Sequence, residues 1–158
     1  MRVAYPPEQP QFGIVEPALF LAGTIEMGNS FDWQAVVLEA LKDKAVLVLN
    51  PRRLDWDASW EQSINNPQFV EQVEWELDML QTANHIVMYL DPSTKAPVSM
   101  LELGLYASKR NMLVCCPDGF WRKGNVEIVC RRMRIPLVHT FDDMLSKITK
   151  WYGDIGTK

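Results

Sequence analysis

The chain has 158 residues, of which 47% are hydrophobic and 23% are charged, and its formal net charge is -4. This length and composition predict a globular protein with a substantial core and exclude a disordered chain. The acidic balance, without a basic block, disfavours a nucleic-acid polymer as partner. The apolar runs are far shorter than a membrane span and no signal-peptide pattern stands at the start, so we expect no membrane partner and a cytoplasmic location.

The cysteines and histidines indicate neither a disulfide framework nor a metal site. Only three cysteines occur, two of them adjacent at Cys115 and Cys116, and the two histidines are far apart in the chain. No Cys-X-X-Cys or His-X-X-X-His spacing is present, so we expect no metal and no cofactor. Cysteine usage of this kind is typical of a cytosolic protein.

The chain begins with a proline-rich segment and then alternates between apolar runs and helical patterns. Residues 1–17 hold four prolines and predict an extended arm, since proline removes a donor and fixes φ. Residues 18–158 are expected to form a single domain. Its strands are predicted at 18–22, 45–49, 85–90, 112–116 and 137–139. Its helices are predicted at 31–41, 67–82, 98–108, 125–133 and 141–152.

These strands are apolar throughout rather than alternating, and helices separate them. That pattern indicates a parallel sheet covered on both faces. With right-handed crossovers it predicts a doubly wound α/β domain with five parallel strands and helices on both faces. Such folds bind ligands beyond the carboxyl ends of their strands, so the loops at 23–31, 50–66, 90–99 and 117–125 are the candidate site.

The first of these loops, "GTIEMGNS", supplies candidate binding residues: Gly23, Thr24, Ile25 and Asn29. Backbone N–H groups of such a loop, beside a helix N-terminus, suit a phosphate or a sugar. The loop is neither a Walker motif nor a Gly-X-Gly-X-X-Gly fingerprint, which disfavours nucleoside triphosphates and dinucleotides. A flexible turn without a ligand explains the same residues equally well.

Three acids are candidates for catalysis. Glu76 falls at the border of the apolar stripe of its helix, about 60° from the centre of the stripe. Asp91 stands at the carboxyl end of the third predicted strand, although an Asp-Pro pair is also an ordinary turn. Glu102 is expected in the first turn or two of the next helix, where the helix dipole favours the ionised form that a nucleophile needs. Each of the three also fits an ordinary structural role.

The loops also offer aromatic and amide groups that suit a base or a sugar. Trp56 and Trp60 lie in the long polar segment 52–66, and either could close over a base. Asn125 belongs to the segment "PDGFWRKGNVEIVC" after the fourth strand. Ser99, at the start of the segment that holds Glu102, is a further candidate for substrate binding. The alternative is that the aromatic side chains simply pack against the fold.

Four segments together resemble the nucleoside 2-deoxyribosyltransferase-like family. They are "LFLAGT", "FVEQVEWELDMLQTANHIVMYLDP", "PVSMLELGLYAS" and "GFWRKGNVEIVC", and the resemblance covers roughly residues 18–139. It implies a flavodoxin-like fold and cleavage of the N-glycosidic bond of a deoxynucleoside. In the transferases of this family a glutamate attacks the anomeric carbon, and a second base or water resolves the deoxyribosyl-enzyme.

The resemblance also implies roles for individual residues. The Glu-Leu-Gly motif of the family falls on residues 102–104, which makes Glu102 the implied nucleophile. The acid that handles the base falls on Glu76 if one inserted residue is allowed before the third strand. Asp91 matches the acid after that strand approximately. Asn125 matches the asparagine that family oligomers contribute to a neighbouring subunit, so a homo-oligomer is implied.

The sequence departs from the transferases at the first strand. They place a tyrosine there, near the nucleophile, whereas the aligned residue is Leu19 with Phe20 beside it, and neither can hydrogen-bond to Glu102. The related deoxynucleotide N-hydrolases carry a Gly-Ser/Thr-Ile phosphate loop that resembles "GTIEMG". Transfer or hydrolysis, and a nucleoside or its 5'-monophosphate, therefore remain alternatives. A non-catalytic nucleotide-binding module that uses the same pocket is the main rival, and a flavodoxin-like FMN or phosphoacceptor domain is less favoured.

Overall fold

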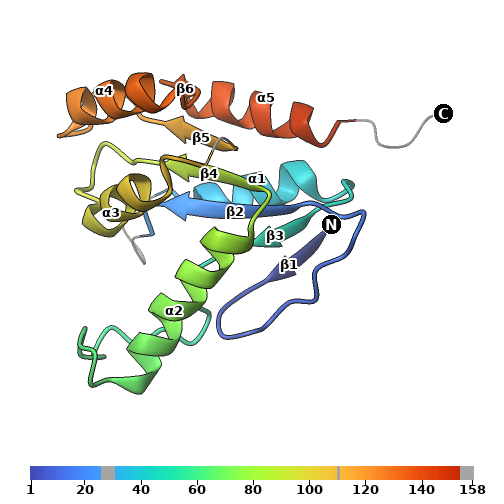
Figure 1. The fold of residues 1–158 in the computed structure, drawn as a ribbon, viewed down its shortest axis with the longest axis vertical. Helices are drawn as coiled ribbons and strands as arrows, with labels where there is room; N and C mark the ends of the chain where they lie inside the picture. Colours follow the sequence, from blue (N-terminus) through green and yellow to red (C-terminus); the bar gives the residue numbers. More distant parts are fainter. Residues whose placement is uncertain (26–30, 110, 154–158) are drawn as a thin grey trace.

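The computed structural model describes residues 1–25, 31–109 and 111–153, and within them the chain forms a six-stranded parallel sheet (Figure 1). The strands are β1 (Arg2–Ala4), β2 (Ala18–Gly23), β3 (Leu47–Leu49), β4 (His85–Tyr89), β5 (Met112–Cys115) and β6 (Leu137–Val138). Their order is β1-β3-β2-β4-β5-β6. Without β1 this is the 2-1-3-4-5 order of flavodoxin-like folds, which confirms the predicted fold class.

The sheet has one strand more than the five predicted. Arg2–Ala4, inside the segment predicted as an extended arm, pairs in parallel with Leu47–Leu49. All four prolines of the arm follow this strand, so none interrupts its hydrogen-bond ladder. A strand of three residues that begins with an arginine carries no recognisable hydrophobic pattern, which is why the sequence did not reveal it. The arm is also tied to a helix, because Trp75 Nε1 donates to the Glu8 carbonyl at 2.7 Å.

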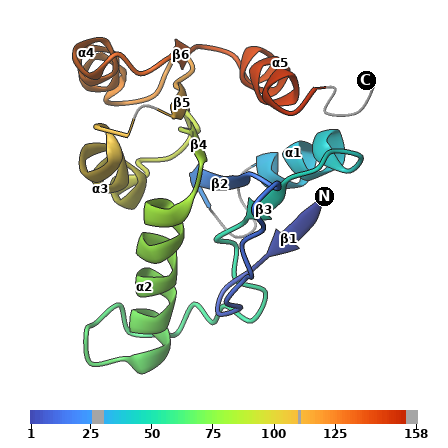
Figure 2. The same ribbon diagram turned by 45° about the vertical axis from the view of Figure 1, so that its right-hand side comes forward.

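Five helices cover the two faces of the sheet within the described residues. They are α1 (Trp33–Leu41), α2 (Pro67–Thr82), α3 (Pro97–Tyr106), α4 (Lys123–Met133) and α5 (Phe141–Trp151). Figures 1 and 2 show α2, α3 and α4 on one face and α1 and α5 on the other, and the two buried clusters divide in the same way. None of these helices combines the length and the apolar character that crossing a membrane requires.

Helix α2 spans the residues that the sequence predicts, and its first residues show why it begins there. Asn66 caps it by accepting a hydrogen bond from the Gln68 backbone N–H at 3.2 Å, and Pro67 occupies the first turn, where no donor is needed. Helix α3 likewise begins at a proline, Pro97, after Ala96 in the left-handed conformation with φ 42°. The loops that precede these two helices therefore have defined geometries.

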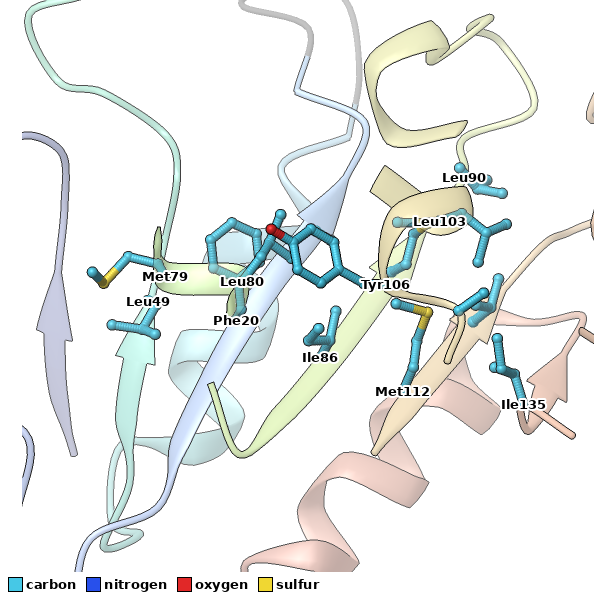
Figure 3. Close-up of a cluster of buried hydrophobic side chains, with 14 of the residues drawn as sticks. Phe20, Leu49, Met79, Leu80, Ile86, Leu90, Leu103, Tyr106, Met112 and Ile135 are labelled. Atoms are coloured by element: carbon cyan, nitrogen blue, oxygen red, sulfur yellow. The ribbon is translucent and has the colours of Figure 1, made fainter. Parts of the chain in front are cut away.

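Alternation along β2 decides which side chains reach the face covered by α2, α3 and α4. Phe20 belongs to the buried cluster on that face, with Leu80 of α2 and Tyr106 of α3 (Figure 3). Leu19 belongs to the cluster against α1 and α5. Because every residue from Ala18 to Ala22 is buried, the sequence pattern alone does not assign the two faces.

Candidate active site

A cavity of about 550 Å³ opens beyond the carboxyl ends of β2 and β3, between α2 and α3. Strand β2 lies between β3 and β4 in the sheet. The chain passes from β2 to β3 on one side of it and then crosses to β4 on the other side. Such a switch point leaves a crevice at the sheet edge where ligands bind. The cavity brings together seven of the predicted site residues: Gly23, Thr24, Ile25, Trp56, Glu76, Ser99 and Glu102.

The crevice depends on a close backbone approach at Gly23. This residue has φ +124°, and a Cβ placed on it would lie 2.1 Å from the Tyr89 carbonyl oxygen of the adjacent strand. Only glycine fits such a position. The next residue continues the contact, because the Thr24 backbone N–H donates to the same carbonyl at 2.9 Å.

Glu102 lies in the second turn of α3, with its side chain toward the cavity and only 7% of the residue exposed. The neighbouring Leu101 is 64% exposed, so the helix turns its acid inward and a leucine outward. Burial raises the pKa of the Glu102 carboxyl to about 8, and repulsion from Glu76 acts in the same direction. This is opposite to the effect expected from the helix dipole, because desolvation outweighs a dipole contribution of about 1 kcal/mol at most.

Glu76 faces the same cavity from α2. Its Oε1 accepts a hydrogen bond from Gln72 Nε2 at 2.6 Å, one turn earlier on the helix. Burial raises the pKa of Glu76 to about 7, and the Gln72 hydrogen bond works against that rise. Gln72 Nε2 also donates to the Pro51 carbonyl at 2.9 Å, which fixes the amide between α2 and the segment that follows β3.

The two carboxyl groups therefore form a coupled acid pair in a partly desolvated cavity. Since each raises the cost of ionising the other, the pair retains a proton near neutral pH. One ionised carboxylate and one carboxylic acid are the two forms that nucleophilic attack and leaving-group protonation require. Near neutral pH the pair can supply both.

Asp91 does not line the cavity. Its Oδ1 accepts hydrogen bonds from the Ser93 backbone N–H at 2.8 Å and from Ser93 Oγ at 2.6 Å, as in the turn-forming alternative. Its own backbone N–H donates to Thr24 Oγ1 at 3.1 Å, and Thr24 Oγ1 lies 3.1 Å from Thr94 Oγ1. The Asp91 carboxylate therefore stabilises the turn between β4 and α3, and the Asp91 backbone N–H holds the Thr24 hydroxyl in place.

The two tryptophans of the segment after β3 differ in their position relative to the cavity. Trp56 lines the cavity, whereas Trp60 lies outside its lining and packs against Trp56 with their ring centroids 5.2 Å apart. The sequence analysis missed Arg53, which lines the same wall and is only 6% exposed. The signal that could have found it is a basic residue four positions after a buried strand, at the sheet edge where ligands bind.

Two predicted residues stand apart from this cavity. Asn125 lies on the exposed surface of α4 and is not part of the cavity lining. Asn29 falls outside the described residues. Leu19, aligned with the tyrosine of the transferases, faces α1 and α5, and it is Phe20 that lines the cavity, packed against Trp75. The β2 side chains that line the cavity, those of Phe20 and Ala22, thus carry no hydroxyl.

The fold and the site define a doubly wound α/β protein with an acid pair at its switch point. Residues 16–120 match the family model described as nucleoside 2-deoxyribosyltransferase like, so the chain belongs to this family. Membership supports a glycosyl-transfer activity of this general kind on small-molecule nucleosides. No curated protein matches the sequence.

The chain is also similar to a conserved protein from Enterococcus faecalis V583, known from its crystal structure. The two are 12% identical with a TM-score of 0.60, and the match covers 86% of this chain and 99% of that chain. At this identity the similarity shows the shared fold alone. The family assignment therefore rests on the family model.

Proposed function

We propose that this protein cleaves the N-glycosidic bond of a 2-deoxynucleoside or deoxynucleotide and passes the deoxyribosyl group to another base or to water. The observation that carries the proposal is the meeting of Glu76 and Glu102 in one cavity at the switch point. They come from different helices, and each is largely buried with a raised pKa. A pair of acids flanking a glycosidic bond is the arrangement that glycosyl transfer uses.

In this proposal the Glu102 carboxylate attacks the anomeric carbon while the bond to the base breaks. The electron pair of that bond leaves with the base, and Glu76 donates its proton to a base nitrogen. An acceptor base or water then attacks the same carbon, returns a proton to Glu76 and frees Glu102. The chemistry needs the proton on Glu76 and the charge on Glu102.

The protein's own residues favour the opposite distribution, because the Gln72 hydrogen bond supports a charged Glu76 and the described residues offer no hydrogen bond to Glu102. Substrate binding reverses it. A base nitrogen that accepts from Glu76 stabilises its acid form, and positive charge that develops at the anomeric carbon stabilises the Glu102 carboxylate. We expect turnover to require this proton redistribution.

The remaining cavity residues bind the substrate in this account. Gly23, Thr24 and Ile25 hold the sugar or its 5' end together with Ser99, and Trp56 stacks on the base. Asn29 of the same loop takes part in holding the 5' end. Asp91 acts through Thr24 as a positioning residue.

We also propose a homo-oligomer in which a neighbour contributes Asn125. Support comes from α3, where three apolar side chains are exposed: Val98, which also lines the cavity, by 59%, Leu101 by 64% and Leu105 by 56%. They lie three and four residues apart and so share one helix face. Exposed apolar patches of this kind mark interaction sites.

We also propose a cytoplasmic location, which the three free, buried cysteines fit.

One observation favours a second candidate, a nucleotide-binding module without turnover. The raised pKa of Glu102 favours the protonated carboxyl near neutral pH, and Phe20 offers no hydroxyl that would orient it. A protonated Glu102 can donate a hydrogen bond to a sugar oxygen without forming a bond to carbon. The two candidates differ in whether a bound nucleoside stays intact.

The test is incubation with a panel of deoxynucleosides and deoxynucleotides, with and without a second base, and identification of the products. We expect release of free base, lowered at least about 1,000-fold in Glu102→Gln. Glu74→Gln is the matched control, because Glu74 is an exposed acid on α2 outside the cavity. Base release at the wild-type rate in Glu102→Gln would overturn the proposal, and an intact bound ligand would favour the binding module.

A further inference from the structure

Two polar groups of the cavity wall have no role in bond cleavage, namely the guanidinium of Arg53 and the side-chain carbonyl of Gln72. We propose that together they select bases with a lactam edge, in which a ring N–H stands beside an oxo group, over the corresponding amino bases. The preferred class comprises 6-oxopurines and 4-oxopyrimidines. The inference rests on the proposed function for the nucleoside nature of the substrate.

Arg53 is held as a rigid donor. Its Nε donates to Asp55 Oδ1 at 2.8 Å, its Nη1 donates to Glu71 Oε2 at 2.9 Å, and its guanidinium lies 5.0 Å from the ring centroid of Trp60. The remaining nitrogen, Nη2, makes no hydrogen bond to the described residues, while the residue lines the cavity. A guanidinium only donates, so the group it receives must be an acceptor.

Charge around Arg53 favours a neutral acceptor over a phosphate. Two carboxylates, Asp55 and Glu71, already contact the guanidinium, and the acid pair of Glu76 and Glu102 lines the same cavity. A phosphate placed on Arg53 would add further negative charge to this wall, where a carbonyl oxygen adds none. The oxo group of a base fits this position.

Gln72 supplies the complementary acceptor. It is 5% exposed, and its amide nitrogen donates to the Pro51 carbonyl and to Glu76 Oε1, which uses both of its N–H groups. Its Oε1 is buried and has no hydrogen-bond partner among the described residues. A buried acceptor without a partner is costly, and a ring N–H brought into the cavity supplies the missing donor.

Both groups belong to the cavity wall at the end of β3. Gln72 is bonded to Pro51, and Arg53 is two residues further along the same segment. A lactam edge presents its oxygen and its N–H next to each other, an acceptor for Arg53 and a donor for Gln72. In adenine or cytosine the order is reversed, since an amino group would face Arg53 and a bare ring nitrogen would face Gln72. Both pairs are then mismatched, donor against donor and acceptor against acceptor.

The position of this wall also suits a base rather than a sugar. Strands β3 and β4 lie on opposite sides of β2, so the segment after β3 and helix α3 border the cavity from opposite sides. In the proposed complex the anomeric carbon therefore lies next to Glu102 on α3, and the far edge of the base lies next to Arg53. Glu76 stands between them, bonded to Gln72.

Calorimetric binding of free bases tests the inference without turnover. Hypoxanthine against adenine, and uracil against cytosine, are pairs that differ at the edge in question. We expect the wild-type protein to bind each lactam base at least about 30-fold more tightly than its amino partner, because sites built to hydrogen-bond one edge reject its reverse. Equal affinities, or no binding of any of the four bases, would overturn the inference, and this comparison needs no variant.

Two variants then assign the selection to Arg53. In Arg53→Gln the amide can donate or accept, so we expect the preference to fall within about threefold. Arg52→Gln is the matched control, because Arg52 pairs with Asp32 and does not line the cavity, and it should keep the wild-type ratio. An Arg53→Gln protein that folds, as judged by circular dichroism, and retains the full ratio would overturn the assignment.

The two proposals fail separately. If lactam bases bind selectively and no nucleoside is cleaved, the proposed function fails and the base selection stands. If deoxyinosine and deoxyadenosine are cleaved with equal kcat/KM and their bases bind equally, the proposed function stands and the base selection fails.

Discussion

Replacing Glu102 by glutamine should stabilise the protein at alkaline pH, by an amount that falls as the pH is lowered. The pKa of this carboxyl rises from an ordinary value of 4.5 to about 8 on folding, because burial and the nearby Glu76 disfavour its charged form. A group whose folded pKa is raised destabilises the fold once the unfolded chain ionises. The stability present below pH 4.5 is therefore lost progressively as the pH rises toward 8.

The size of the effect follows from these two pKa values. At 1.36 kcal/mol for each pH unit, the cost is about 1 kcal/mol at pH 5 and about 5 kcal/mol at pH 8.5. Glutamine has no such cost at any pH, although burying its amide costs about 1–3 kcal/mol at all pH values. The pH-independent part cancels in a difference, so the gain from Glu102→Gln should grow by about 4 kcal/mol between pH 5 and pH 8.5.

Urea unfolding of the wild type, Glu102→Gln and the exposed control Glu74→Gln at the two pH values measures this difference. We expect the midpoint of Glu102→Gln, taken relative to that of the wild type, to be clearly higher at pH 8.5 than at pH 5. The control should follow the wild type at both. A gain that stays constant with pH would show that Glu102 is not held in a desolvated cavity beside Glu76.

Three further predictions concern other parts of the site. In Gln72→Leu the loss of the hydrogen bond raises the pKa of Glu76 further, so the alkaline limb of the kcat/KM profile should move to higher pH; an unmoved limb would exclude Glu76 as the acid. Gly23→Ala should destabilise by about 3 kcal/mol or more and lower Tm by about 10 °C, since its Cβ would lie 2.1 Å from a backbone oxygen; an unchanged melting curve would contradict the close approach. Asn125→Ala should lower turnover without lowering Tm, and mixing it with Glu102→Gln subunits should restore part of the activity; no restoration after subunit exchange would argue against a site shared between subunits.

Much of the architecture could be predicted because local signals were strong. The asparagine–proline start of α2 and its apolar stripe fixed both ends of that helix, and its angular pattern placed Glu76 at the border that now faces the cavity. Strands that are apolar throughout indicated a parallel sheet, and the parallel order implied a ligand site at the carboxyl edge. These inferences need only neighbouring residues.

Other features depend on contacts between distant segments. Arg53 is buried because Glu71 of α2 and Trp60 hold it, which a polar stretch of sequence does not reveal. The strand at Arg2–Ala4 forms only by pairing with β3. A strand buried on both faces gives no sign of which residue faces which side, so Leu19 was aligned where Phe20 lines the cavity.

The burial of Glu102 shows the same limit. Its leucine neighbours suggested a buried segment, but the sequence placed the acid near an exposed helix start. Only the packing of α3 beside α2 shows that the carboxyl is desolvated and lies near a second acid. The resulting rise in pKa could not be derived from spacing.

Peptide mass spectrometry after rapid quenching shows directly whether Glu102 forms a covalent bond to the deoxyribosyl group. The protein is mixed with a deoxynucleoside that it binds, quenched with acid and digested. We expect one deoxyribosyl group attached to the peptide that carries Glu102, with an equal amount of free base released and no adduct in Glu102→Gln. An unmodified protein with its nucleoside bound and intact after long incubation would contradict this expectation.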